Sequence, residues 1–219
     1  MQDAGTAARL APDPAVMVAE LFGEQVRARA DRGEVARLRE AFPSGYLAVQ
    51  FSADFGDDET LTRPAAQLDR ACESTGLGVA LFRAGAAPWH DELDALQRVA
   101  ARMRSGTAKV FASLDLWEIC ALVAAARGYC GSSLHGRIVA MAFALPRVNL
   151  RHPSARARTG KQAAFASAWD LAQMPAVVDI DDAAAAIGQA LAADPARLAP
   201  AQLAARFREE FAAMRDRLA

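Results

Sequence analysis

Short apolar runs alternate with longer amphipathic segments along most of the chain. The runs at residues 46–51, 76–82 and 108–113 are bounded by Gly, Pro or acidic residues, as buried strands are. Three shorter runs continue the series: YCGS, RVNL and AVVD, at 129–132, 147–150 and 176–179. The segments between them repeat apolar residues three and four positions apart, which indicates helices. About six strand–helix alternations predict an α/β fold: a Rossmann-like parallel sheet with helices on both faces.

The two ends of the chain are predicted to add an arm and helices to this α/β fold. Residues 1–14 are polar and contain Pro12 and Pro14, which predicts an N-terminal arm before a helix at 16–30. Near the C-terminus, residues 181–218 have helical periodicity in two segments, which either cover the sheet or form a dimer face. We therefore expect an arm at 1–14 and a single domain at 15–219 that ends in C-terminal helices.

Composition and charge narrow the classes of function. Hydrophobic residues make up 53% of the chain and charged residues 23%, which is typical of a folded globular protein. The net charge of −1 supplies no general attraction for nucleic acid, so any anion site must be local. Three cysteines without a CxxC spacing argue against a disulfide framework and a zinc site, and we expect neither metal nor cofactor. Because the sequence has no apolar signal core or membrane-length apolar run, we expect a cytoplasmic protein.

The turn at residues 131–136 carries the main candidate chemistry. A strand ending at Cys130 is followed by Gly131, Ser132 and Ser133, and a helix is predicted from Leu134 to about Leu145. The free N–H groups of a first helical turn suit a phosphate or carboxylate, and the small residues allow close approach. His135 would lie in that first turn, where a bound anion would let it exchange a proton near neutral pH. The alternative is a serine that only caps the helix and a histidine that is only a surface residue.

The stretch GSSLHGRIVAMAFALPRVNL, residues 131–150, resembles the polysaccharide pyruvyl transferase family. The shared pattern is a strand, a small-residue turn, Leu-His-Gly, a small-residue helix and a Pro before the next strand. The segments at 161–171 and 11–18 resemble, respectively, the part that follows this motif and the passage into the family's second domain. The resemblance covers nearly the whole chain, but only Ser-Leu-His-Gly is specific.

The resemblance implies a fold and an activity. Members of the family are two-domain GT-B proteins, and this chain resembles the C-terminal half. They transfer pyruvyl from phosphoenolpyruvate to a pair of sugar hydroxyls as a ketal, in exopolysaccharide biosynthesis. The implied partners are phosphoenolpyruvate and an acceptor that is a sugar or a lipid-linked saccharide. His135 would transfer a proton or hold the phosphate, and an anion cradle would be formed by Gly131, Ser132, Ser133 and Gly136, with Arg137 nearby.

Weaker candidates follow other strands. Arg151 opens a basic loop at 151–161, suited either to phosphate contact or simply to solvent, and it also contains His152, Arg156, Arg158 and Lys161. Arg83 follows the second predicted strand and His90 lies in the next loop, both on the expected ligand edge. The acidic residues Asp54, Asp57 and Asp58 lack a histidine at a metal-binding spacing, so we expect them to be solvated.

Two departures from the family keep other functions open. Many relatives have arginine where this chain has Ser133, so we expect weaker donor binding. The segment before Tyr46 is also too short for the N-terminal domain that presents the acceptor. The chain is then the donor-binding half of an enzyme, or a non-catalytic partner or anion-binding module that completes a separate N-terminal domain or forms a homo-oligomer. A GT-B glycosyltransferase fits less well, because residues 131–140 contain no carboxylate for the ribose of a nucleotide sugar.

Overall fold

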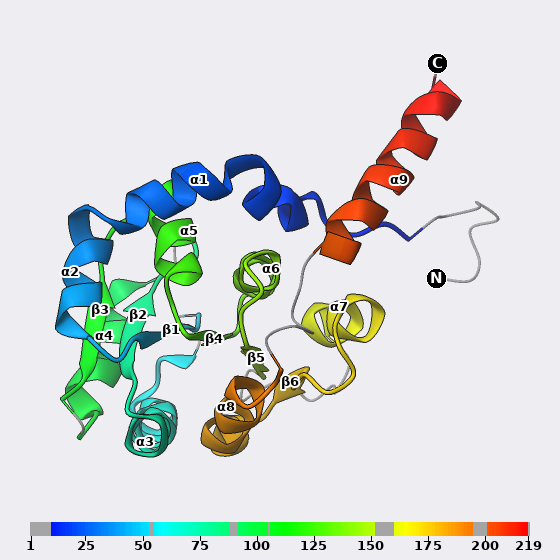
Figure 1. Ribbon diagram of the computed structural model, residues 1–219. Coiled ribbons are helices and arrows are strands. Elements are labelled where there is room, and N and C mark those ends of the chain that lie inside the picture. Colours follow the sequence, from blue (N-terminus) through cyan, green and yellow to red (C-terminus); the bar gives the residue numbers. More distant parts are fainter. Residues whose placement is uncertain are drawn as a thin grey trace.

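A computed structural model describes residues 10–52, 55–87, 92–104, 106–151, 160–194 and 201–218 of the chain. Within these residues lies a six-stranded sheet in the order β3-β2-β1-β4-β5-β6, and every neighbouring pair is parallel (Figure 1). The predicted parallel sheet is confirmed. Its strands are β1 Tyr46–Gln50, β2 Gly78–Phe82, β3 Ala108–Phe111, β4 Gly128–Gly131, β5 Arg147–Leu150 and β6 Val177–Val178.

Helices connect the strands and cover both faces of the sheet. In Figure 1, α1, α5 and α6 lie on one side of the sheet, and α3 and α8 lie on the other. The α-helices are α1 Val18–Ala30, α2 Gly33–Ala41, α3 Asp58–Thr75, α4 Leu93–Arg102, α5 Leu116–Ala124, α6 Leu134–Ala142, α7 Lys161–Trp169, α8 Ala183–Leu191 and α9 Ala201–Leu218. Two short 3-10 helices, η1 Pro14–Met17 and η3 Ile180–Asp182, precede α1 and α8. α2, which buries Val35 and Leu38, was not predicted from the sequence.

The buried β1 strand divides the core into two halves. Leu47 and Val49 pack with apolar residues of α3, α4 and α8, whereas Tyr46 and Ala48 pack with those of α1, α2, α5 and α6. Alternate residues of a strand point to opposite faces, so a strand covered on both sides is apolar throughout. This is why the run YLAVQ has no polar alternation.

Two helices end several residues before the next strand begins. Asp115 caps α5, because its carboxylate accepts a hydrogen bond from Glu118 N at 2.9 Å, and the helix ends at Ala124. Gly128 begins β4, where a side chain would approach Pro146 O at 3.2 Å. Similarly, α6 ends at Ala142 rather than Leu145. Both segments leave the helix early because the chain must reach the next strand.

The two C-terminal helices, α8 and α9, pack differently against the rest of the molecule. α8 packs on the face formed by α3, β4 and β5, so it covers the sheet. The start of α9 contacts η1 and α6 through Ala204, Val16 and Ile138. Its far end runs away from the body of the molecule, and Phe211 and Met214 are each about half exposed (Figure 1). Residues 1–9 of the predicted arm lie outside the described part, and the division at residue 14 stays a prediction.

The strand order reverses direction between β1 and β4. The chain runs outward from β1 toward β3 on one side and from β4 toward β6 on the other, so connections leave these two central strands in opposite directions. In open α/β sheets, ligands bind at this point, beyond the carboxyl ends of the strands. Here those ends are Gln50 and Gly131, which are paired in register. No helix in the described ranges is both long enough and apolar enough to cross a membrane.

Candidate functional site

The β4–α6 turn is tied to the end of β1. Ser132 N donates to Gln50 O at 3.0 Å, and Ser132 Oγ accepts from Ser52 N at 3.2 Å. A side chain at Gly131 would come within 2.3 Å of Gln50 O, so this close approach requires glycine. The turn therefore lies at the carboxyl ends of the two central strands, where the strand order changes direction.

The first turn of α6 has both satisfied and free N–H groups. Ser133 is the N-cap, with its Oγ accepting from Gly136 N at 3.2 Å. Ser133 N in turn donates to the side-chain oxygen of Gln50 at 2.9 Å. Within the described ranges, the N–H groups of Leu134 and His135 have no acceptor. These two donors remain available to an anion.

Gln50 is a residue that sequence reasoning missed. Its side chain is buried at the end of an apolar strand, and its oxygen holds the turn that precedes α6. A buried amide costs free energy unless it is hydrogen-bonded, so its position has a structural reason. One feature of the sequence could have indicated Gln50: it is the polar last residue of an otherwise apolar strand.

His135 lies on the open side of the turn. Its side chain is 73% exposed, and Nε2 is 3.8 Å from Asp13 Oδ2. Asp13 is itself fixed, because its other carboxylate oxygen accepts from Ala15 N at 2.8 Å and caps η1. The Asp13 carboxylate is thus held beside the exposed imidazole of His135.

Gly136 contributes packing rather than a free donor. A side chain there would meet the Tyr129 hydroxyl at 2.5 Å, so glycine lets α6 lie directly on β4. Its N–H already donates to the capping serine. The expectation that Gly136 lines the anion cradle is therefore not supported by the contacts.

Arg137 points away from the turn, into the protein. It is fully buried, and Nη2 lies 2.6 Å from Asp170 Oδ2. Nη1 donates to Asn149 Oδ1 at 3.1 Å and to Ala176 O at 2.9 Å. Arg137 was expected near the anion cradle; it is instead turned away from the cradle, because its buried guanidinium has protein acceptors.

Arg83 and Arg151 lie on the expected edge but on opposite sides of the turn. Arg83 follows β2 and donates to Ala112 O at 2.8 Å, beyond β3. Its buried Nε has no acceptor among the residues described. Arg151 follows β5 and pairs with Asp179 at 2.7 Å, beyond β6. The fold therefore does not bring these two arginines together with His135.

Of the remaining candidate residues, two have structural roles, and the others lie outside the described residues. Asp57 caps α3 by accepting from Thr60 N at 2.6 Å, and Asp58 lies 2.5 Å from Arg102 Nη2. No group of three or more His, Cys, Asp or Glu side chains in the described ranges is arranged to hold a metal. Other sequence candidates lie outside the described residues: Asp54, His90, His152, Arg156 and Arg158.

A separate cavity lies at the opposite, amino end of the sheet. It has a volume of about 560 Å³ and is lined by Arg39, Tyr46 and Arg127 among others. Arg39 donates to Ala30 O, the last residue of α1, at 3.2 Å. Cations are favoured at helix C-termini, so this arginine has a structural reason to be there. The cavity is distant from the β4–α6 turn in the fold.

Comparison with known proteins gives a family and a fold. The family model described as polysaccharide pyruvyl transferase matches residues 1–154. No curated protein matches the chain. The structure is similar to an α,α-trehalose-phosphate synthase (UDP-forming) from Burkholderia xenovorans in complex with glucose-6-phosphate: the TM-score is 0.56 and the identity 18%, over 93% of this chain and 48% of that one.

The structure is also similar to two further trehalose-phosphate synthases. The α,α-trehalose 6-phosphate synthase from Burkholderia multivorans has a TM-score of 0.54 and 14% identity, over 84% of this chain and 44% of that one. The enzyme from Burkholderia vietnamiensis has a TM-score of 0.54 and 15% identity, over 93% and 51%. The chain thus spans about half the length of these GT-B glycosyltransferases. At such identities the likeness shows the fold, and it confirms the predicted GT-B-like half.

Proposed function

The chain belongs to the polysaccharide pyruvyl transferase family, and we propose that it supplies the donor-binding half of a pyruvyl transferase, with phosphoenolpyruvate bound at the β4–α6 turn. The observation that carries this proposal is the position of the Ser-Leu-His-Gly segment. It opens α6 beside the carboxyl ends of β1 and β4, where the N–H groups of Leu134 and His135 have no acceptor among the described residues. A helix N-terminus attracts anions, and phosphoenolpyruvate carries both a phosphate and a carboxylate.

The chemistry divides into four tasks. The methylene carbon of phosphoenolpyruvate takes up a proton, positive charge develops at the neighbouring carbon, and a sugar hydroxyl bonds to that carbon and loses its proton. A second hydroxyl then bonds to the same carbon and loses its proton to a base or to the leaving phosphate. The phosphate departs with its bridging oxygen, and the ketal closes. Each task requires a proton donor, a proton acceptor or an anion site.

Two groups of this chain suit those tasks. The Leu134 and His135 N–H groups would bind the phosphate or the carboxylate. The imidazole of His135 would deliver the proton to the methylene carbon or donate to the departing phosphate. Asp13 would help to orient the imidazole, because its carboxylate lies 3.8 Å from Nε2.

The acceptor would meet this turn from another domain. The chain spans about half the length of the GT-B structures it resembles, so a separate N-terminal domain or a second copy would face the carboxyl edge of the sheet. We propose a sugar or a lipid-linked saccharide as the acceptor, on the basis of the family. The nucleotide-sugar alternative is less favoured, because no carboxylate occurs in residues 131–140.

A second candidate function is a non-catalytic anion-binding partner. It is favoured by the arginines: Arg137, Arg83 and Arg151 all donate to acceptors within the protein, and Ser133 replaces the arginine of many relatives. An anion would then bind weakly at the turn without being turned over. Turnover of phosphoenolpyruvate in the presence of a separate acceptor domain distinguishes this function from the first.

The test is calorimetric titration of phosphoenolpyruvate into the full chain, beside the His135→Ala variant. Glu73→Ala is the matched control, because Glu73 is an exposed residue of α3 on the other face of the sheet. A UDP-sugar is the comparator ligand. We expect binding of phosphoenolpyruvate that His135→Ala abolishes and Glu73→Ala preserves. Binding of the UDP-sugar alone would favour a glycosyltransferase, and binding of neither ligand would contradict the donor-binding function.

A further inference from the structure

The carbonyl oxygen of Ser133 accepts hydrogen bonds from two side chains beneath the turn and from the backbone of α6. The Tyr129 hydroxyl donates at 3.1 Å, Asn149 Nδ2 at 3.2 Å and Arg137 N at 3.3 Å. Burial raises the pKa of the Tyr129 phenol, so the group keeps its proton and acts as a donor. These donors direct this carbonyl into the body of the protein.

The direction of that carbonyl determines the direction of the next N–H. In a planar trans peptide, the C=O of one residue and the N–H of the following residue point in opposite directions. With the Ser133 carbonyl aimed inward, the Leu134 N–H is aimed outward, toward the open side of the turn. This agrees with its lack of an acceptor among the described residues.

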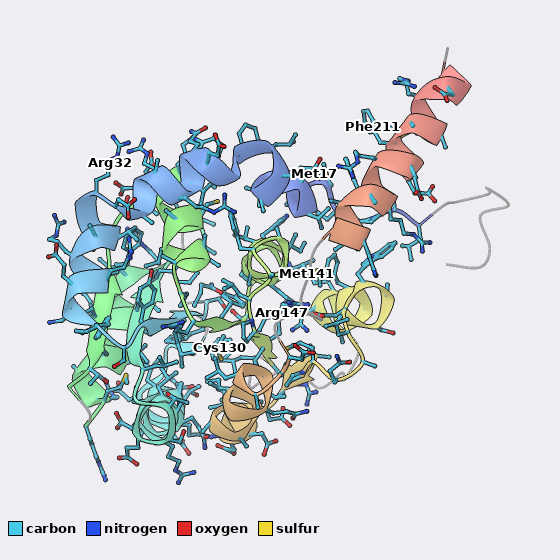
Figure 2. The ribbon with its side chains drawn as sticks, viewed as in Figure 1. Met17, Arg32, Cys130, Met141, Arg147 and Phe211 are labelled. Atoms are coloured by element: carbon cyan, nitrogen blue, oxygen red, sulfur yellow. The ribbon has the colours of Figure 1, made fainter. Side chains whose placement is uncertain are left out.

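Asn149 is held in one orientation by the charged groups behind it. Its Oδ1 accepts from Arg137 Nη1 at 3.1 Å, which leaves Nδ2 to donate to Gly131 O at 2.8 Å and to the Ser133 carbonyl. Arg137 is bound to Asp170, and Asp170 is bound in turn to Arg147 Nη2 at 2.5 Å. Figure 2 shows Arg147 in the interior, beneath α6 and beside α7. The fully buried cluster thus fixes both carbonyls of the turn through a single amide.

The charge of the cluster also favours an anion at the turn. Two guanidiniums, Arg137 and Arg147, share the single carboxylate of Asp170, so one positive charge is not neutralised within the cluster. Buried charge is costly unless it is compensated, and its field is weakly screened in the interior. An anion bound at the free N–H groups of α6 would supply part of that compensation.

We propose that Tyr129 and Asn149 are positioning residues for the donor, which hold the Ser133 carbonyl inward so that the Leu134 N–H faces the anionic group of phosphoenolpyruvate. The proposal rests on the function proposed above, that the turn binds this donor. Neither residue touches the ligand. Each acts through the peptide that joins Ser133 to Leu134.

The experiment follows the amide resonances of Leu134 and His135 in the ¹⁵N-labelled full chain during titration with phosphoenolpyruvate and, separately, with inorganic phosphate. Tyr129→Phe removes only the hydroxyl. The matched control is Tyr46→Phe, because the buried Tyr46 hydroxyl donates to Leu122 O at 2.8 Å, away from the turn. Asn149→Asp keeps the acceptor for Arg137 but replaces the amide donor.

We expect the Leu134 amide to shift on titration of the wild-type chain. Tyr129→Phe is expected to weaken binding by about threefold, as the loss of one hydrogen bond of ordinary strength implies. Asn149→Asp is expected to weaken it by about tenfold or more, because the variant also puts a negative charge beside Arg137 and beneath the anion. Tyr46→Phe is expected to lower the unfolding midpoint as Tyr129→Phe does, without any change in affinity. A merely structural role for Tyr129 would make the two tyrosine variants equal in both readouts.

The outcomes separate the two proposals. Wild-type binding that neither Tyr129→Phe nor Asn149→Asp weakens would overturn the positioning role and leave the donor-binding function standing. If Asn149→Asp fails to fold, the comparison of the two tyrosine variants decides alone. A response of the Leu134 amide to phosphate but not to phosphoenolpyruvate would overturn the donor assignment. No response to either ligand would overturn both proposals.

Discussion

Arg137 and Asp170 form an ion pair, with Nη2 and Oδ2 2.6 Å apart, in which both side chains are completely buried. Arg137 belongs to the first half of α6, and Asp170 is the residue that follows α7. Arg147 of β5 binds the same carboxylate at 2.5 Å. A single buried carboxylate therefore joins a helix, a strand and the end of a second helix beneath the candidate site.

Asp170→Asn is expected to destabilise the protein by about 3–5 kcal/mol, because it leaves two buried guanidiniums without an anionic partner. Urea denaturation measures the change in the free energy of unfolding. The control is Asp181→Asn, since Asp181 pairs with Arg63 at the surface and both side chains are largely exposed. A control variant as unstable as Asp170→Asn would contradict the importance of burial.

The same carboxylate predicts a dependence of stability on pH. Burial acts to raise the pKa of Asp170, but the hydrogen bonds and charges of Arg147 and Arg137 outweigh it and hold that pKa below its usual value. A folded-state pKa below the unfolded-state pKa gives stability above about pH 4, which is lost as the pH falls through the folded-state pKa. Wild type and Asp170→Asn should therefore differ less in their free energy of unfolding below about pH 4 than at pH 7, as measured by urea unfolding from pH 7 to pH 2. A difference that stays constant over this pH range would contradict the lowered pKa of Asp170.

Gly136→Ala and Gly188→Ala are expected to change stability in opposite directions. Alanine is favoured over glycine in helices by about 0.8–1.0 kcal/mol, so Gly188→Ala in α8, where a side chain would meet nothing within 4 Å, should stabilise the protein. At Gly136 the new carbon would lie 2.5 Å from the Tyr129 hydroxyl, and the variant should be destabilised despite its better helix propensity. Thermal unfolding of both variants checks this, and equal shifts would contradict the close packing of α6 on β4.

Ser133→Arg tests the departure from the family motif. Loss of the cap should cost about 1 kcal/mol of stability, whereas an arginine at the turn should strengthen phosphoenolpyruvate binding about tenfold, the usual gain from a charged hydrogen bond. Ser133→Ala is the control, since it removes the same cap without adding charge. Calorimetry and thermal unfolding separate the two effects. Tighter binding by both variants, or by neither, would contradict the role assigned to this position.

The three cysteines are expected to be inert in the folded protein. Cys72, Cys120 and Cys130 are all buried and form no disulfide within the described residues, and burial raises the pKa of the Cys130 thiol to about 12. Because the thiolate is the reactive form, a thiol reagent should label none of them until urea unfolds the chain. Rapid labelling of native protein at neutral pH would contradict the burial of these side chains.

The candidate site could be located from the sequence but not assembled from it. The motif at Ser133, Leu134 and His135 follows a strand, which predicts a helix N-terminus at the ligand edge, and α6 does begin at Leu134. The partners of the motif come from distant segments: Gln50 is 83 residues before Ser133, and Asn149 is 16 residues after it. Nothing in the local pattern indicates which way an arginine turns, so Arg137 was expected near the anion cradle.

The sequence by itself determined the strands, the helices between them and the parallel sheet, because those depend on the local spacing of apolar residues and on short connections. It also determined the family, through one short motif. The tertiary structure alone decided which polar groups face the ligand and which are buried, because that choice is made by contacts between segments far apart in the chain. Arg137 is the example: its position follows from the periodicity of α6, but its direction follows from a carboxylate 33 residues away.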